Sequence, residues 1–587
     1  PQKIYCLGTP SGLAGATTQP ANTLTWPGIR LPAESTESAA WTLATTFWQE
    51  SRDVVICDAN DYASALTASS LAAKLRAPLL FSSDDGISAA TMSCIRHLEV
   101  KNAAFVGDKA IQHAHQLTEA GLTVAKLRDA HDVLAWLKGG AFLEGGPLSD
   151  TPLDRIDTRV TYLAVANPAD REKLVIRKLS LAAALLAAGR GGLAVPLSYD
   201  AVWKVGFLGQ EIKGDAPKGT PASKKPPRRG KIDVGGTEFD YVVTSGRGTN
   251  YVYINIDLNG NGDFGDKGEG PLGCADVVNI GDREYSLSLG VTHGLTGAHV
   301  RITAPTAGQI VGDLKRLYKA MGGPATHLAI VAMPDGIPQA IVAEEDPGRL
   351  DICSDFPFTN ADDDLFGEVA VGRVTAENAV FATLYASRAV TYWELLDPTW
   401  QDKAGQASWE NTYAGLFENV GFVVAPQHDL DKMGWLDQPD RRGRRQRERG
   451  FRQDSPLSSV AAIAHTDHSW WHEIGHTYDW DSQVLLAPVV VESGGCLTTA
   501  LDRQPDYHSV VSRMLRNGAV AFVGNALPAT AYQEQQRMMF WNDVLSREKT
   551  IGQAQLDASN GAVAVMLETG QEKGGPNHYM LYLCGLF

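Results

Sequence analysis

The sequence lacks several features that would assign it to a specialised class of protein. Its apolar runs fall well short of the roughly 20 residues that span a bilayer, so we predict no transmembrane segment. Its seven cysteines include no Cys-x-x-Cys pair, and they are too few in 587 residues for a disulfide scaffold. Acidic residues outnumber basic ones by 68 to 52, and the net charge of −16 argues against a nucleic-acid partner.

The length points to several domains, because a single hydrophobic core rarely grows beyond about 250–300 residues. We expect three of them, over residues 1–205, 206–306 and 307–587. The sequence begins with Pro1 rather than Met, which is compatible with the removal of a leader peptide and therefore with export.

The first region alternates apolar strands with helices. Strands are expected at 53–60, 78–83 and 102–108, and an Ala- and Leu-rich helix at 63–77. Apolar strands that alternate with helices are typical of a parallel sheet covered on both faces. We therefore predict an α/β fold that begins with a Rossmann-like module over residues 1–205.

The second region has a different pattern. Residues 206–235 are rich in Lys, Pro and Gly, and we expect a linker or an exposed loop there. Between 232 and 306 apolar and polar residues alternate, with Gly- and Asn-rich turns between the alternating stretches. This pattern predicts a small inserted antiparallel β domain.

Within that domain, "DLNGNGDFGDKGE" places oxygen-bearing side chains at alternate positions of a glycine-rich loop. Such a loop can point several oxygens at one centre, which suits a hard cation with six to eight oxygen ligands. A polar hairpin turn would use the same residue types. We predict a structural calcium site, with ligands among Asp257, Asn259, Asn261, Asp263 and Asp266 and with Glu269 beyond them.

From residue 307 onward the α/β pattern returns. Strands are expected at 327–336, 367–374, 487–496 and 517–526, and a long helix at 377–396. In open α/β sheets the chemistry is found where such strands end. Residues 468–496 contain candidates for two different chemistries at such a position.

The first candidate is a zinc peptidase. His472 and His476 are four residues apart and would share one face of a helix, with Glu473 as the general base. A tetrahedral zinc site needs a third protein ligand, which Glu492 could supply.

The second candidate is a cysteine nucleophile. Cys496 follows a strand of β-branched residues and two glycines. A thiol at a strand end needs a nearby imidazole to accept its proton. The backbone amides of Gly494 and Gly495 could approach an oxyanion, because glycine allows close contact.

Longer sequence segments favour the cysteine-nucleophile hypothesis over the zinc-peptidase hypothesis. The segment "DICSDFPFTNADDDLFGEVAVGRVTAENAV", the pair "EIGHTYDW" and "VVVESGGC", and the downstream "MLRNGAVAFVGNA" and "FWNDVLSREKTIGQAQLDA" resemble gingipain-like cysteine peptidases. The resemblance runs from about residue 327 to the end, and it implies a caspase-like α/β fold, a Cys/His dyad and a protein or peptide substrate. Thr477 stands where that family usually has Gly after the catalytic His.

The N-terminal region carries a second resemblance. "DYASALTASSLAAKLRAPLLF", followed by "AAFVGD", resembles the type-two cell-wall-binding repeats of bacterial surface proteins over roughly residues 36–140. It implies a secreted or cell-surface protein that contacts the wall or a surface layer.

We therefore expect a cysteine endopeptidase with Cys496 as nucleophile, and we prefer His476 as its general base over His465. The spacing favours His465, because a crossover between parallel neighbours needs a dozen or more residues. Against it, "SPLSSVAAIAH" is also compatible with a helix capped by Ser455. Two alternatives stay open: the zinc peptidase, and a non-catalytic surface or adhesion protein with a decayed peptidase domain.

Overall fold

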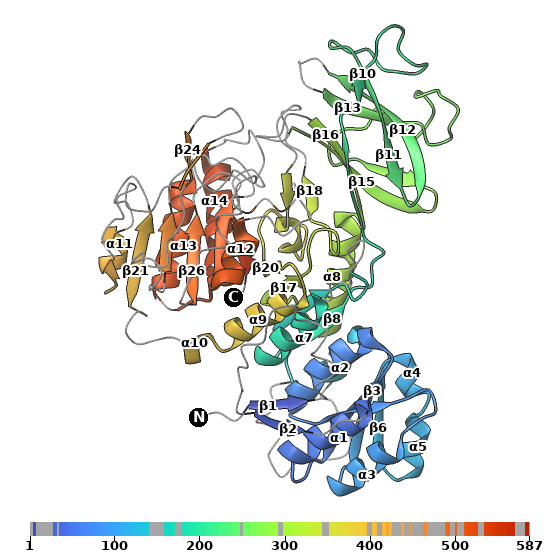
Figure 1. The fold of residues 1–587 in the computed structure, drawn as a ribbon, viewed down its shortest axis with the longest axis vertical. Helices are drawn as coiled ribbons and strands as arrows, with labels where there is room; N and C mark the ends of the chain where they lie inside the picture. Colours follow the sequence, from blue (N-terminus) through green and yellow to red (C-terminus); the bar gives the residue numbers. More distant parts are fainter. Residues whose placement is uncertain are drawn as a thin grey trace. The chain divides into compact units, whose positions relative to one another are not determined.

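The computed structural model describes part of the chain in detail. The described residues are 4–7, 28–31, 35–139, 158–170, 179–246, 251–291, 298–342, 352–395, 402–407, 414–419, 421–424, 436–439, 445–448, 462–465, 488–493, 499, 501, 510–525, 533–546, 548–569 and 581–585. They form two compact units (Figure 1). The first unit comprises Pro1–Ala164, Ala183–Pro196 and Arg316–Ala325, and the second comprises Val165–Ala182, Leu197–Lys315 and Thr326–Phe587.

The first unit is built on a four-stranded parallel sheet in the order β4-β3-β5-β6. Its strands are β3 (Asp53–Asp58), β4 (Leu79–Ser82), β5 (Asn102–Val106) and β6 (Thr123–Leu127). Every residue of β3 and β5 is buried, as expected for strands covered by helices on both faces. The predicted Rossmann-like parallel sheet is therefore confirmed.

Helices connect these strands, and a smaller strand pair precedes them. The helices are α1 (Thr36–Phe47), α2 (Tyr62–Leu75), α3 (Ala89–His97), α4 (Asp108–Ile111), α5 (Ala114–Glu119) and α6 (Ala130–Lys138). β1 (Ile4–Leu7) pairs in parallel with β2 (Gly28–Leu31). β7 (Tyr162–Ala166), α7 (Ser180–Gly189) and β8 (Leu193–Pro196) follow along the chain.

The helix starts follow from sequence. Asp61 precedes α2, and its side chain accepts a hydrogen bond from the backbone N–H of Ser64, which is an N-cap interaction. Asp129 caps α6 in the same way, through the N–H of Asp132. The apolar face of α1 packs with β3, β5 and α3 in one core cluster.

Two four-stranded antiparallel sheets form the β region of the second unit, in the orders β10-β11-β12-β13 and β14-β15-β16-β9. Their strands are β9 (Val202–Phe207), β10 (Gln210–Glu211), β11 (Arg228–Val234), β12 (Thr237–Ser245), β13 (Tyr251–Ile256), β14 (Val277–Ile280), β15 (Arg283–Val291) and β16 (Ala298–Ala304). One core cluster joins the two sheets. Within the segment 206–235, predicted as a linker or an exposed loop, residues 212–227 are a loop with mostly exposed side chains. Its two ends differ from the prediction, because they contain β10 and β11.

The α/β part of the second unit has a mixed sheet that includes the strand order β22-β21-β25-β26-β27-β28-β20-β17. Its strands are β17 (His327–Val331), β20 (Ala370–Val374), β21 (Lys403–Ala407), β22 (Val423–Val424), β25 (Ala462–His465), β26 (Val489–Ser493), β27 (Ala519–Asn525) and β28 (Leu581–Gly585). The strands from β22 to β27 are parallel to one another. β28 runs antiparallel to β27 and parallel to β20, so the strand direction changes there.

Helices and two short hairpins accompany this sheet. The helices are α8 (Ala307–Met321), α9 (Ala379–Val390), α10 (Tyr392–Leu395), α11 (Ala414–Asn419), α12 (Val510–Asn517), α13 (Gln533–Ser546) and α14 (Ile551–Thr569). β18 (Ala340–Val342) pairs with β19 (Ile352–Ser354), and β23 (Leu436–Pro439) with β24 (Arg445–Glu448). The predicted α/β class is confirmed, and no helix in the described part of the chain is long and apolar enough to cross a membrane.

Candidate active site

The carboxyl ends of β25 and β26 bring two predicted site segments together. The strands are parallel neighbours, and the register pairs Ala464 with Glu492 and His465 with Ser493. His465 and Ser493 are the last residues of their strands. Neighbouring strands lie about 4.8 Å apart. The backbone of His465 is therefore beside the strand end from which the chain continues to Cys496.

The predicted catalytic residues are covered to different extents. His465 lies in β25, so residues 462–465 form a strand and the helical alternative is wrong for them. Cys496, Gly494, Gly495 and His476 lie outside the described residues. The spacing favours His465 as a residue on the parallel neighbour of β26, and β25, which ends at His465, is such a neighbour.

A buried ion pair holds β26 just before this edge. Glu492 is fully buried, and Arg537 of α13 donates from Nε to its Oε1 and, at 2.7 Å, from Nη2 to its Oε2. Trp541 Nε1 donates to the same Oε2 at 3.2 Å. Trp541 packs edge-on against Phe417 of α11, with 5.0 Å between ring centroids. These contacts fix the strand that leads to Cys496.

The same contacts bear on the zinc alternative. Both carboxylate oxygens of Glu492 already accept hydrogen bonds from Arg537, so the proposed third zinc ligand is committed to a buried ion pair. His472, Glu473 and His476 lie outside the described residues. No local sequence pattern predicts Arg537 as the partner of Glu492, because 45 positions separate the two residues.

A second buried ion pair lies at β20. Arg373 is fully buried and binds both carboxylate oxygens of Asp355 at 2.7 Å. Its Nη1 donates to the carbonyls of Ala332 and Ile337, at 3.0 and 2.8 Å. Arg373 therefore ties the segment after β17 to β20. Asp355 and Arg373 both lie in the segment that resembles gingipain-like peptidases, but residue types there do not predict their pairing.

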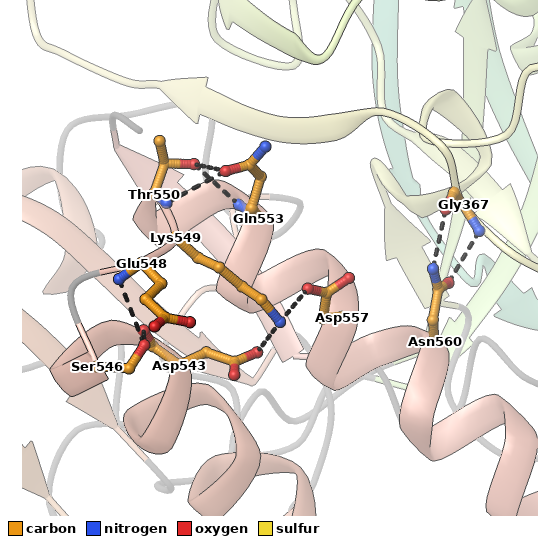
Figure 2. A network of polar contacts seen from close by, with 9 residues as sticks. All are labelled: Gly367, Asp543, Ser546, Glu548, Lys549, Thr550, Gln553, Asp557 and Asn560. Atoms are coloured by element: carbon orange, nitrogen blue, oxygen red, sulfur yellow. Dashed lines mark hydrogen bonds and ion pairs between the residues drawn. The ribbon is translucent and has the colours of Figure 1, made fainter.

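The acidic loop before β20 could hold a metal ion. Carboxylate oxygens of Asp362, Asp364 and Glu368 lie within 4.8 Å of one another. Burial raises the pKa of Glu368, and the charges of Asp362 and Asp364 raise it further. Asn560 of α14 clamps the loop, because its side chain exchanges two hydrogen bonds of 2.9 Å with the backbone of Gly367 (Figure 2).

Gly367 is required for this close approach. A Cβ atom there would lie 2.4 Å from Thr359 Oγ1 and 2.8 Å from a methyl of Leu556. Lys549 lies between α13 and α14 and binds Asp543 of α13 at 2.9 Å and Asp557 of α14 at 2.7 Å (Figure 2). Asn560 therefore joins the acidic loop to α14, and Lys549 joins α14 to α13.

The predicted calcium ligands lie in the β region, outside the peptidase-like segment. Asp266 Oδ2 accepts hydrogen bonds from the amides of Asn259 and Asn261, each at 2.8 Å. Asp257 is buried beside them, whereas Asp263 forms an ion pair with Lys218 at 2.7 Å. Four of the five predicted ligands therefore lie together in the loop, whereas the side chain of Asp263 binds Lys218.

A protein-family model matches the C-terminal part of the chain. Residues 304–585 match the model of peptidase family C25, a family of cysteine peptidases that includes the gingipains. The resemblance drawn from the motifs is confirmed over this range. No comparison supports the zinc or the non-catalytic alternative. No curated protein matches the chain.

Three solved structures show distant similarity. Cwp6 from Clostridium difficile is 19% identical over 28% of this chain and 24% of its own, with a TM-score of 0.22. A protein described as a protease is 12% identical over 48% and 68%, with a TM-score of 0.36. The Arg-specific cysteine proteinase gingipain R is 15% identical over 48% and 67%, with a TM-score of 0.35. TM-scores and identities this low do not allow function to be transferred from these structures. The match spans about a quarter of the length of Cwp6.

Proposed function

We propose that the chain, whose residues 304–585 carry the peptidase family C25 domain, is a cysteine endopeptidase with Cys496 as its nucleophile and His465 as its general base. The observation that supports this pairing is the register of β25 and β26, in which His465 lies beside Ser493. Three residues after Ser493 the chain reaches Cys496. The proposal replaces His476, which the sequence motif favoured, with His465.

The proposed reaction follows from these roles. The imidazole of His465 accepts the thiol proton of Cys496, and the thiolate attacks the carbonyl carbon of the scissile peptide bond. Backbone N–H groups of Gly494 and Gly495 stabilise the oxyanion that forms. The protonated imidazole then gives its proton to the leaving amine, which leaves an acyl-enzyme. Water, deprotonated by the same imidazole, hydrolyses the thioester and restores the thiol.

Three matched variants test the dyad on denatured casein. We expect Cys496→Ala to abolish hydrolysis. We expect His465→Ala to lower kcat by about 10²–10⁴-fold, the usual contribution of a general base, and His476→Ala to change it by only a few-fold. The rate at which iodoacetamide alkylates Cys496 at pH 6 should fall in His465→Ala alone, because a paired imidazole lowers the thiol pKa.

Two outcomes would decide against parts of the proposal. A large loss in His476→Ala with normal activity in His465→Ala would return the role to His476. Full activity in Cys496→Ala, together with inhibition by a zinc-selective chelator, would remove the cysteine mechanism. Circular dichroism of each variant controls for loss of fold.

We also propose that the protein is secreted or held at a bacterial cell surface, where its N-terminal module contacts the wall or a surface layer. The wall-repeat motif within residues 36–140, on a parallel α/β module, supports this setting. We expect the full chain to sediment with purified bacterial walls in physiological salt. Protein that stays in the supernatant with walls from several species would contradict the contact.

A further inference from the structure

The loop between Asp257 and Glu269 is closed at its base by backbone pairing. Ile256 N–H donates to the carbonyl of Glu269 at 2.8 Å, and Ile254 forms a two-way bridge with Leu272 at 2.9 Å. Asp257 and Glu269 therefore face each other at the two ends of the loop. The residues between them are mostly exposed.

Asp257 organises the first half of this loop. Its Oδ1 accepts hydrogen bonds from the N–H groups of Gly260 and Asn261, at 2.7 and 3.1 Å, and its Oδ2 accepts one from Gly262 at 2.8 Å. Gly260 and Gly262 have φ values of +74° and +78°, which glycine adopts without strain. A carboxylate has about four lone pairs, so three backbone bonds leave one for a further partner.

The amides of Asn259 and Asn261 add two more oxygens. Asn259 Oδ1 accepts a single backbone bond, from Asn261 N–H at 2.9 Å. Asn261 Oδ1 likewise accepts one from Asp263 N–H, at 2.7 Å. Both Nδ2 groups bind Asp266 Oδ2. The two amide nitrogens therefore converge on Asp266 Oδ2, while each amide oxygen accepts one hydrogen bond and keeps a lone pair for a further partner.

Glu269 supplies the independent observation. Its side chain is 2% exposed, and its Oε1 accepts hydrogen bonds from the N–H groups of Leu258 and Asn259, which places the carboxylate inside the loop. Its Oε2 is buried and has no hydrogen-bond partner among the described residues. A buried carboxylate oxygen without a partner is costly unless a cation or a donor satisfies it.

The electrostatics point the same way. The negative charges of Asp257 and Asp266 both act on the buried carboxylate of Glu269. Among the described ion pairs, no basic side chain binds Asp257, Asp266 or Glu269, so their negative charges stay uncompensated by the protein. Asp263 is different, because Lys218 binds it and lowers its pKa.

We propose that this loop binds one Ca²⁺ ion through Asp257, Asn259, Asn261, Asp266 and Glu269, and that Asp263 is not a ligand. All five donors are oxygens, which favours Ca²⁺ over Zn²⁺, and the mixture of carboxylates and amides suits its irregular coordination. The proposed ligand set differs from the predicted one because it leaves out Asp263 and includes Glu269, which the sequence places just beyond the predicted ligands.

The ion would stabilise more than its own loop. Phe264 N–H donates to the carbonyl of Lys218 at 2.8 Å. A Cβ atom on Gly219 would lie 2.0 Å from the backbone nitrogen of Gly265, so the two loops touch through their backbones. Ordering residues 257–269 therefore also orders the segment between β10 and β11.

The test is calorimetric titration of the full chain with CaCl₂ after treatment with a chelator and dialysis. Glu269→Gln and Asp263→Asn each replace one carboxylate of the same loop by its amide, so they change the net charge equally. We expect Glu269→Gln to lose one Ca²⁺ equivalent or to weaken that site at least about tenfold, since even outer-shell losses at metal sites cost about 10–100-fold. We expect Asp263→Asn to bind as wild type does.

A second variant covers the case in which Glu269→Gln fails to fold. Asn259 is exposed, so Asn259→Ala should fold and should lower the affinity of the same site. In wild type, the thermal midpoint should rise with CaCl₂ more than with equal MgCl₂. Equal calcium binding by wild type, Glu269→Gln and Asn259→Ala would overturn the proposal. So would a loss in Asp263→Asn as large as that in Glu269→Gln.

Discussion

The two parallel sheets of this chain end in polar residues that are used in different ways. In the N-terminal sheet, Asp58 ends β3 and binds the N–H of Asn60, and Asp61 caps α2. In the C-terminal sheet, β25 and β26 end at His465 and Ser493, and the next helix among the described residues is α12. The side chains at the first edge bind backbone N–H groups at the start of α2 and in the turn before it. At the second edge His465 lies beside Ser493, three residues before Cys496.

The difference also extends beneath the edges. β3 carries buried carboxylates only at its two ends, Asp53 and Asp58, and Asp58 accepts a hydrogen bond from the backbone N–H of Asn60. β26 instead carries Glu492 inside the sheet, paired with Arg537. Parallel α/β architecture therefore does not by itself indicate a catalytic edge. The C-terminal edge differs in that two strand ends, at His465 and Ser493, pair next to the buried ion pair of Glu492 and Arg537.

The largest effect should come from breaking that ion pair. Glu492→Ala leaves the guanidinium of Arg537 buried and unpaired, and we expect the free energy of unfolding to fall by about 3–5 kcal/mol. The matched change at the other edge, Asp61→Ala, removes only a helix cap and should cost about 1 kcal/mol. Urea unfolding of the full chain, followed by hydrogen exchange of β26 and α2, measures both.

The comparison would fail if the two variants lost equal stability. Replacing both partners, Glu492→Leu with Arg537→Met, should recover part of the loss, because no charge is then left buried. If the double variant were less stable than Glu492→Ala, the buried pair would be contributing more than charge compensation.

A smaller effect should distinguish the sheets by pH. Asp53 begins β3 at 8% exposure, and burial raises its pKa to about 6 despite a 2.8 Å hydrogen bond from Asn102. The folded pKa lies above the unfolded value, so the associated stability is present below about pH 4 and is lost as the pH rises through about 6. A shift of about two units corresponds to about 3 kcal/mol as an upper figure.

Asp53→Asn should therefore flatten the pH dependence of the N-terminal sheet between pH 4 and 7 and leave that of β26 unchanged. Hydrogen exchange of peptides from β3 and β26 at several pH values gives the two slopes. Equal slopes for β3 in wild type and variant would show that another group controls the dependence.

Sequence patterns predicted the strands well where the residues are uniformly apolar or strictly alternating. β3, β5, β26 and β27 all lie within predicted strands, because buried parallel strands have an unmistakable composition. The pattern was least informative at "SSVAAIAH", where Ala-rich residues suit a helix or a strand. Pairing with β26 decides in favour of a strand there, and pairing between distant segments is invisible to local composition.

Residue types alone select the segments of the predicted site, namely the Gly-Gly-Cys sequence after β26 and the acidic loop before β20. They do not select the partners of the side chains. The partner of Glu492, Arg537, lies on a helix 45 positions away. Likewise, alternation along the loop selected Asp263, but a lysine from another loop binds it. Both partners are set by the tertiary fold, which local sequence patterns do not contain.

The position of β28 has a consequence for the order in which the peptidase domain can be assembled. β28 lies between β27 and β20, so those two strands cannot join into one sheet until residues 581–585 have been made. β27 ends at Asn525, and at about 5–20 residues per second the ribosome needs about 3–11 s more to reach Leu581. During that interval β26, the strand that precedes Cys496, has been made, but β28 is not yet in place to join β27 to β20. Translation itself would then delay proteolytic competence until the rest of the chain has emerged.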